Sequence, residues 1–114
     1  MAENKDSDEI LLPKFSEADK FIHQSARLKL ISLLYVIEEA DYVFLKNQTG
    51  LTWGNLSSHM DKLEEKGYIY VKKEFKEKKP QTTAKLTKKG RKAFEDYRQK
   101  IKKMEKMLKM ADSN

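Results

Sequence analysis

The sequence predicts a mainly α-helical domain that carries one small β-hairpin and ends in a long helix. Apolar residues recur at intervals of three and four through most of the chain, which is the spacing of one buried helix face. Between residues 68 and 86 the interval changes to two and β-forming residues dominate, which indicates a pair of strands. The 114 residues fit one folding unit, which we divide into an N-terminal arm at 1–15, a core domain at 16–86 and a C-terminal helix with its tail at 87–114.

Composition excludes several classes of function. The chain has no cysteine and only two histidines, so we expect neither disulfides nor thiolate or multi-histidine metal sites. It has no Ser/His/Asp order with supporting spacing and no glycine-rich phosphate loop, so we expect no catalytic residues, no cofactor and no enzyme. No apolar run approaches the roughly 18 residues of a membrane span, and the acidic N-terminus lacks the apolar core of a signal peptide. We therefore expect a cytoplasmic protein with no membrane partner.

The net charge of +6 is distributed unevenly along the chain. Residues 1–24 carry a net charge of −3, whereas residues 68–90 carry +6 and residues 91–114 carry +4. A basic C-terminal half of this kind predicts a polyanionic partner. The alternative is a lysine-rich surface that only aids solubility.

Three helices are expected before residue 51. Ser16, followed by acids, is a candidate N-cap for a short helix that ends near Ile22. Ser25 is a candidate cap for a second helix, which ends near Ala40. A short helix around Leu45 then ends at Gly50, because glycine suits a left-handed C-terminal stop.

Thr52 is the expected N-cap of a fourth helix, over residues 52–66. Its apolar residues Leu56, Met60 and Leu63 fall on one face. The short segment 48–51 joins this helix to the one before it, which gives a helix-turn-helix pattern.

Residues 68–75 and 81–86 are the expected strands of the hairpin, joined by a five-residue basic loop at 76–80. Thr87 is the expected cap of the last helix. Apolar residues at alternating intervals of three and four predict a dimer interface on that helix; they are Phe94, Tyr97, Ile101, Met104 and Leu108. The alternative is that this stripe covers the chain's own domain.

Helices, a helix-turn-helix and a hairpin with a basic tip follow one another in the order of a winged helix. The motifs LTWGNLSSHMDKLEEKGYI at 51–69 and LTKKG at 86–90 carry a closer resemblance, supported by ARLKLI at 26–31 and KPQTT at 79–83. Over residues 20–100 the chain resembles the small winged-helix transcriptional regulators of prokaryotes, related to the MarR and ArsR groups. The resemblance implies a homodimer that binds double-stranded DNA, with 16–86 as the DNA-binding domain and 87–114 as the dimerisation helix and tail.

In this interpretation residues 52–66 enter the major groove and the wing at 76–80 holds the flanking backbone. A period of 100° per residue places polar side chains on the outward face of the fourth helix, and Asn, Ser and Lys reach base edges and phosphates. Every basic residue of the wing is Lys, which favours backbone attachment over sequence reading. The predicted DNA contacts are Thr52, Trp53, Gly54, Asn55, Ser57, Ser58, Lys62, Lys73, Lys76, Lys78, Lys79 and Arg27.

Some residues have two interpretations. His59 is expected to be packed or half-buried, with a phosphate contact as the alternative. Packing is favoured over base contact for Trp53, and Arg27 either anchors its helix or touches phosphate. Asp61 and Glu65 oppose phosphate binding, so they must lie at the far end of their helix.

The chain departs from the family pattern at Val43 and Phe44, where polar residues are usual. These two residues pack against the N-terminal arm or form a contact surface. The sequence therefore leaves open a protein-interaction module, as well as a chromatin-like protein that coats DNA without preference. Asn55 and Ser58 argue against the coating protein. The operator, the choice between repression and activation, and any small-molecule effector stay open.

Overall fold

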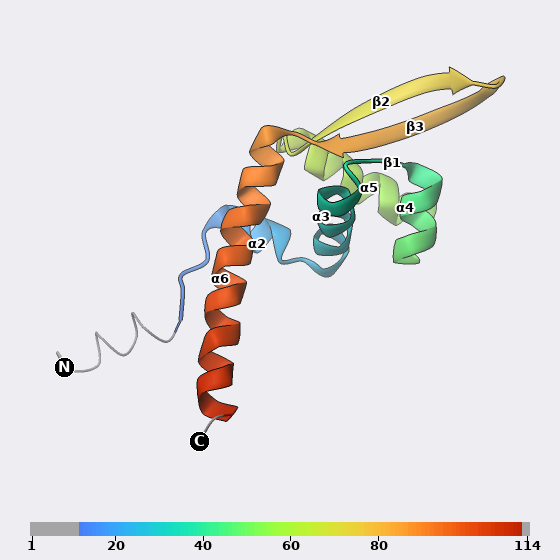
Figure 1. Cartoon of the computed structure of the whole chain (residues 1–114). Coiled ribbons are helices and arrows are strands. Elements are labelled where there is room, and N and C mark those ends of the chain that lie inside the picture. The colour runs from blue at the N-terminus through green and yellow to red at the C-terminus, as the bar shows by residue number, and fades with distance from the viewer. Residues whose placement is uncertain (1–11, 113–114) are drawn as a thin grey trace.

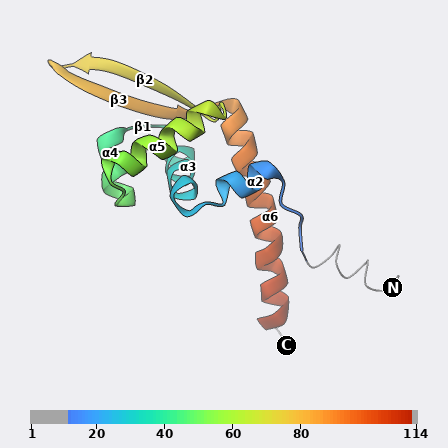
Figure 2. The same ribbon diagram turned by 180° about the vertical axis from the view of Figure 1, so that it is seen from behind.

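The computed structural model describes residues 12–112, so the arm predicted at 1–15 lies mostly outside the described residues. In chain order the elements are α2 (Glu17–Ile22), α3 (Ser25–Ile37), β1 (Glu39–Asp41), α4 (Tyr42–Thr49), α5 (Trp53–Glu65), β2 (Ile69–Lys76), β3 (Lys79–Leu86) and α6 (Lys88–Asp112). Figures 1 and 2 show a helical body with the β2–β3 hairpin projecting from one side and α6 running away from it. The mainly helical class with a hairpin and a long last helix is confirmed.

A single apolar core joins α2, α3, α4 and α5 beneath the sheet. Its fully buried side chains come from the apolar positions spaced at three and four, and are Ile22, Leu30, Ile31, Leu34, Leu45, Leu56, Met60 and Leu63. Each such side chain contributes roughly 1.5–3 kcal/mol when it leaves water. The core therefore fixes α5 against α3 and α4, with its opposite face outward.

The helix ends follow local capping chemistry. Ser16 forms a reciprocal capping box with Asp19, and Thr52 accepts a hydrogen bond from the Asn55 amide. Gly50 ends α4 at φ 72°, in the left-handed region where glycine has no steric penalty. The cap predicted at Ser25 is wrong by one residue, because the Gln24 side chain accepts from the Arg27 amide and Ser25 already belongs to α3.

The second helix ends earlier than predicted, and a third strand follows it. Glu38, at φ 75°, stops α3 after Ile37. Residues Glu39–Asp41 form β1, which pairs antiparallel with β3 and gives the sheet order β1-β3-β2. The sequence does not predict this strand because its residues are not β-formers; pairing with β3 imposes the extended backbone.

The hairpin is tighter than predicted. The strands pair up to Lys76 and Lys79, so the turn is Glu77 and Lys78 alone, both at positive φ. That conformation matches the twist of two-residue hairpins, and it replaces the predicted five-residue loop. Pro80 lies within β3, beyond the three residues that pair with β1. The wing is therefore a paired ribbon to its tip.

The start of α6 is held against the start of β2. The Thr87 hydroxyl donates to the Gly67 carbonyl at 2.6 Å and accepts from the Gly90 amide at 3.0 Å. A Cβ on Gly90 would lie 2.1 Å from the Tyr68 carbonyl oxygen, so only glycine permits this approach. The LTKKG motif therefore serves as a joint between the wing and the last helix.

Further along, α6 packs on α2. The Tyr97 hydroxyl lies 2.7 Å from His23 Nδ1, and Lys100 donates to the buried carboxylate of Asp19. Beyond these contacts the helix leaves the body (Figure 1). Within residues 12–112 no helix is both long and apolar enough to cross a membrane.

Candidate nucleic-acid interface

One face of α5 is directed to solvent. Leu56, Met60 and Leu63 are fully buried on the other face. The exposed residues include all the predicted contacts of this helix, namely Thr52, Trp53, Gly54, Asn55, Ser57, Ser58 and Lys62. The first two turns of α5 carry no carboxylate, and apart from Trp53 their outward side chains are small or polar. This face is therefore suited to approach by an anion.

The N-terminal turn of α5 is open. Within 4 Å of the position of a Cβ on Gly54 there is no neighbouring atom, so packing does not require glycine there. Glycine in a helix costs roughly 0.5–1 kcal/mol relative to alanine. The open space leaves the first-turn amides of α5 accessible, and a phosphate contact at Gly54 remains a prediction.

Trp53 lies beside this turn and is 50% exposed. The ammonium of Lys46 in α4 lies 5.4 Å from the centre of its ring, which places a positive charge next to the N-terminus of α5. Sequence reasoning missed Lys46, because only the helix-turn-helix geometry brings it to Trp53. Packing and base contact both remain predictions for Trp53.

The acidic residues of α5 lie toward its C-terminal end. Burial, together with the charges of Asp61 and Glu64, raises the pKa of Tyr42 to about 12. Tyr42 begins α4, so these carboxylates act on the neighbouring helix, and Glu65 is the last residue of α5. Asp61 and Glu65 therefore lie away from the N-terminal turn of α5, where contact with phosphate is predicted.

Arg27 braces three helices. Its Nε donates to the Phe21 carbonyl at 2.7 Å, its guanidinium lies 4.3 Å from the centre of the Phe21 ring, and one terminal nitrogen lies 3.4 Å from His59 Nδ1. His59 is half-buried, as expected. Burial, then Arg27 and Lys62, lowers its pKa, so the imidazole is neutral near pH 7. Arg27 therefore holds α2 and α5 to α3, and its contact with DNA remains a prediction.

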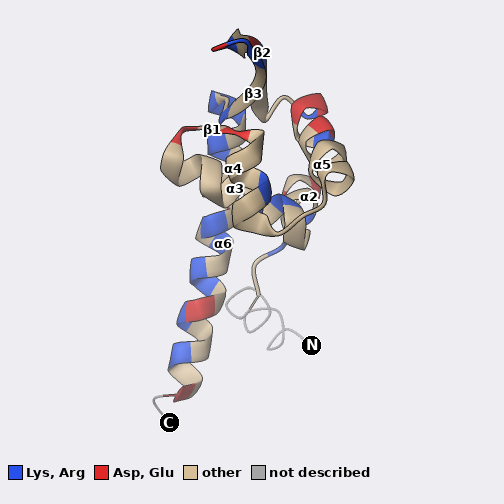
Figure 3. Ribbon diagram, turned by 90° about the vertical axis from the view of Figure 1, so that its right-hand side faces the viewer, with Lys and Arg blue, Asp and Glu red and all other residues tan. Residues whose placement is uncertain are grey.

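The wing presents its lysines to solvent, and Figure 3 shows blue segments near its tip. Lys73, Lys76, Lys78 and Lys79 are all exposed. Lys76 stands directly opposite Lys79 across the ribbon. Like charges in this position repel, and phosphate would relieve the repulsion. The wing as a whole is thus a basic ribbon with paired lysines just before its turn.

Sequence reasoning missed a second feature of the wing. Phe75 is 75% exposed and lies opposite Pro80, so an apolar pair stands next to the paired lysines. The signal was present in the sequence as an aromatic residue just before the basic tip, but its exposure depends on the register of the hairpin.

The stripe predicted as a dimer interface is divided between two environments. Phe94 and Tyr97 are buried in the chain's own core, so they leave little surface for a partner. Ile101 and Met104 are half-buried, and Leu108 is 55% exposed. Only the distal half of the stripe is available to a second molecule in this arrangement.

Two further apolar features are exposed. Val43 is 57% and Phe44 36% exposed at the start of α4. A groove of about 550 Å³ lies along α3 and the end of α4, lined by apolar side chains that include Leu28, Leu33 and Val36. Within residues 12–112 there is no cluster of three or more side chains suited to a metal ion.

Comparison with known proteins agrees with this geometry. Residues 26–105 match the family described as winged helix DNA-binding domain. An uncharacterized protein of Methanocaldococcus jannaschii is 40% identical over 78 residues, which are 68% of this chain and 85% of that protein.

Solved structures share the fold. A transcriptional regulator homologue from Pyrococcus horikoshii matches with a TM-score of 0.67 and 22% identity, over 82% of this chain and 89% of that one. The transcriptional repressor BigR from Xylella fastidiosa matches with a TM-score of 0.58 and 23% identity, over 84% of this chain and 87% of that one. The structure of NadR in complex with 4-hydroxyphenylacetate matches with a TM-score of 0.64 and 19% identity, over 89% of this chain and 94% of that one.

Proposed function

Because this chain belongs to the winged helix DNA-binding domain family, we propose that it is a homodimeric transcriptional regulator that binds double-stranded DNA. The observation that carries the proposal is the outward face of α5, which has no carboxylate in its first two turns and stands beside a lysine-rich wing. In this proposal α5 enters the major groove, and the wing lies on the flanking backbone. It is a binding function without a catalytic step.

Sequence preference comes from α5. Asn55 and Ser58 project from the turns that approach the bases, and an amide side chain makes paired hydrogen bonds with adenine. Gly54 and the open N-terminal turn take a backbone phosphate, which fixes the depth of the helix in the groove.

Affinity comes mainly from the wing. Lysine acts as a point charge on phosphate and lacks the planar fork of arginine, so the contribution of the wing is nearly independent of sequence. A dimer that neutralises about six phosphates loses about 10³-fold in affinity between 50 and 200 mM salt.

The distal part of α6 forms the dimer in this proposal. Ile101, Met104 and Leu108 lie on one helix face that the described body covers only in part. A second copy related by a two-fold axis would cover it, and the operator would be roughly palindromic with half-sites near one helical turn apart.

Fluorescence anisotropy tests the proposal most directly. The labelled duplexes are the intergenic DNA upstream of the gene for this protein and a scrambled duplex of equal length, each titrated across a salt series. A strong preference for the upstream duplex together with a steep salt slope supports a site-specific regulator. No binding at low salt rejects the DNA function and favours the protein-interaction alternative, for which Val43 and Phe44 are exposed.

Equal and tight binding to both duplexes would favour the coating alternative. A library of random duplexes separates that outcome from an operator located elsewhere, because only a site-specific protein enriches a common sequence. Repression and activation are then distinguished by transcription from a promoter that carries the enriched site.

The apolar groove on α3 is the place where we propose that a small effector binds. Its volume of about 550 Å³ lies in the range of ligand pockets, and its lining is mostly apolar. An apolar fluorescent probe such as anilinonaphthalene sulfonate should brighten on binding, and Val36→Asp should abolish that signal. An unchanged signal in the variant would place the probe elsewhere.

A further inference from the structure

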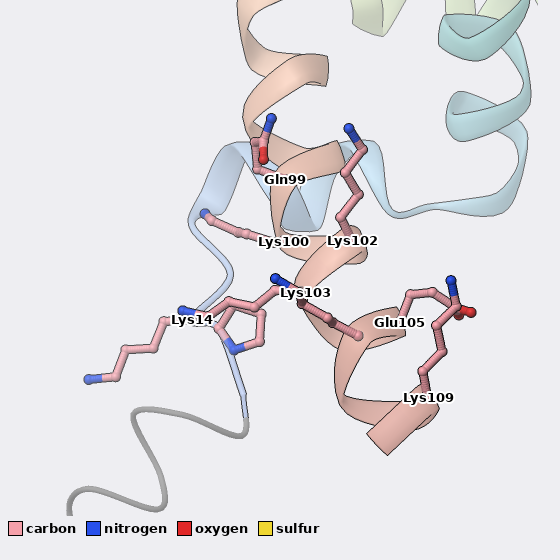
Figure 4. A pocket seen from close by; sticks show the side chains of 9 residues that line it. Lys14, Gln99, Lys100, Lys102, Lys103, Glu105 and Lys109 are labelled. Atoms are coloured by element: carbon pink, nitrogen blue, oxygen red, sulfur yellow. The ribbon is translucent and has the colours of Figure 1, made fainter. Parts of the chain in front are cut away.

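A basic groove runs along the distal half of α6, on the part of the helix that leaves the body. Its volume is about 790 Å³. Figure 4 shows the side chains of Lys14, Lys102, Lys103 and Lys109 around it, together with Glu105. Six lysines line the groove against one carboxylate, so it is an anion-binding surface by composition. We call it the α6 lysine groove.

Within residues 12–112, most of this charge has no ion-pair partner. Lys100 is paired with Asp19. The other lining lysines are exposed, and among residues 12–112 none lies within ion-pair distance of a carboxylate; they are Lys14, Lys102, Lys103, Lys106 and Lys109. Like charges at helical intervals of three and four repel one another. The groove therefore favours a polyanionic occupant.

The groove lies apart from the proposed DNA interface. In both views of the ribbon, the distal part of α6 runs away from the β2–β3 hairpin and from α5 (Figures 1 and 2). A duplex held by α5 and the wing would not reach these lysines, so they are available to another acidic partner.

The chain itself supplies an acidic segment that ends at this groove. Residues 1–11 contain Glu3, Asp6, Asp8 and Glu9 against one lysine. The described chain begins at Leu12, and the next two residues, Pro13 and Lys14, line the groove.

The length of the segment also fits. Eleven residues span at most about 36 Å when extended. The part of α6 from Gln99 to Lys109 is about 15 Å long, at 1.5 Å per residue. Asp8 and Glu9 are four and three residues from Leu12, so the chain between them is long enough for their carboxylates to lie at the groove.

We propose that the acidic segment 1–11 docks in the α6 lysine groove of the same chain. The segment neutralises the distal half of α6 and keeps other polyanions off it, so that only α5 and the wing remain as a strong anion-binding surface. This role stands independently of whether the protein regulates transcription.

Zero-length crosslinking of the full chain tests the contact. A carbodiimide joins a carboxylate to an amine only when the two are in ion-pair contact. We expect crosslinks from Asp8 or Glu9 to Lys103, Lys106 or Lys109. In an equal mixture of ¹⁴N- and ¹⁵N-labelled protein, the two peptides of each crosslinked pair should carry the same isotope, because both come from one chain. Crosslinks of mixed label would show that the segment docks on a second copy and would overturn docking within one chain.

Lysine acylation provides a second measurement. The matched variant carries Glu3→Gln, Asp6→Asn, Asp8→Asn and Glu9→Gln, which preserve shape and remove charge. In this variant we expect acylation of Lys103 and Lys106 to rise at least threefold, while Lys76, Lys78 and Lys79 of the wing stay unchanged. Equal rates at the groove in both proteins would overturn the proposal. So would protection of the groove lysines that appears only when a DNA duplex is added.

Discussion

Lys100 of α6 donates a hydrogen bond to the carboxylate of Asp19 in α2, although the two residues are 81 positions apart in the sequence. Asp19 is 1% exposed and also accepts from the backbone and hydroxyl of Ser16. The same carboxylate thus caps α2 and fastens it to α6. The direction in which α6 leaves the body depends on this contact, together with the nearby pair of His23 and Tyr97.

Replacing Lys100 by methionine should lower the free energy of unfolding by about 1–3 kcal/mol at pH 7, because it leaves a buried carboxylate without its cation. Lys102→Met is the matched control, since Lys102 is exposed on the same helix and has no ion-pair partner among residues 12–112. Urea denaturation measures both. An equal effect of the two substitutions would show that the ion pair does not stabilise the fold.

The same pair predicts an acid dependence. Burial alone would raise the pKa of Asp19, but the hydrogen bonds from Lys100 and Ser16 outweigh it and hold the pKa below the ordinary value of 3.8. A carboxyl whose pKa is depressed by folding contributes stability above its unfolded pKa and loses it as the pH falls through the folded pKa. Unfolding free energies from pH 5 to pH 2 should therefore fall more steeply in the wild type than in Asp19→Asn. Parallel curves would contradict this origin of acid sensitivity.

Gly90→Ala should destabilise the protein strongly. The new Cβ would meet the Tyr68 carbonyl oxygen at 2.1 Å, so α6 or the start of β2 must shift. Overpacking against backbone costs about 1–3 kcal/mol and sometimes more. Thermal unfolding followed by circular dichroism measures the loss. A melting temperature equal to that of the wild type would show that α6 and the start of β2 can move apart without loss of stability.

Gly54→Ala should have two opposite effects. The Cβ meets open space, so the variant should be more stable by about 0.4–1 kcal/mol through reduced entropy of the unfolded chain. If α5 binds DNA as proposed, the same methyl group obstructs a phosphate at the N-terminus of α5. The affinity for DNA should therefore fall at least fivefold. Denaturation and anisotropy on the same sample separate the two. A more stable variant with unchanged affinity would remove Gly54 from the interface.

Much of this arrangement is predictable because its causes are local. Thr52, Gly50 and the capping box at Ser16 act within three or four residues, and each is where the sequence places it. The exposed face of α5 also follows from its period, since the buried Leu56 and Met60 determine which side chains remain outside.

The features that sequence reasoning missed depend on distant partners. β1 is extended because it pairs with β3, more than 40 residues later, and the turn at Glu77 has neither glycine nor asparagine to reveal it. The sequence leaves Arg27 either as a helix anchor or as a phosphate contact, and it does not reveal that its partners, Phe21 and His59, lie on two other helices. No periodicity shows that Lys100 reaches Asp19.

The paired lysines of the wing give a prediction on salt dependence. The double substitution Lys76→Gln and Lys79→Gln should reduce the slope of log affinity against log salt by about 1.8 per protomer, because each lysine neutralises one phosphate. The loss should be nearly the same for the preferred and the scrambled duplex. Lys102→Gln with Lys106→Gln, on α6, is the control of equal charge. If that control changes the slope as much, net charge rather than the wing governs binding.

The distal stripe of α6 gives the prediction on assembly. Leu108→Glu should convert the dimer to a monomer, because a charge would be buried where a second copy covers the stripe. The fold should be kept, since Leu108 is 55% exposed within one chain. Gln99→Glu introduces the same charge on the opposite side of the helix and should leave the dimer intact. Light scattering coupled to size exclusion measures the mass of each protein. A wild type that is monomeric at every concentration would refute the homodimer, whereas a dimeric Leu108→Glu would place the interface on another surface.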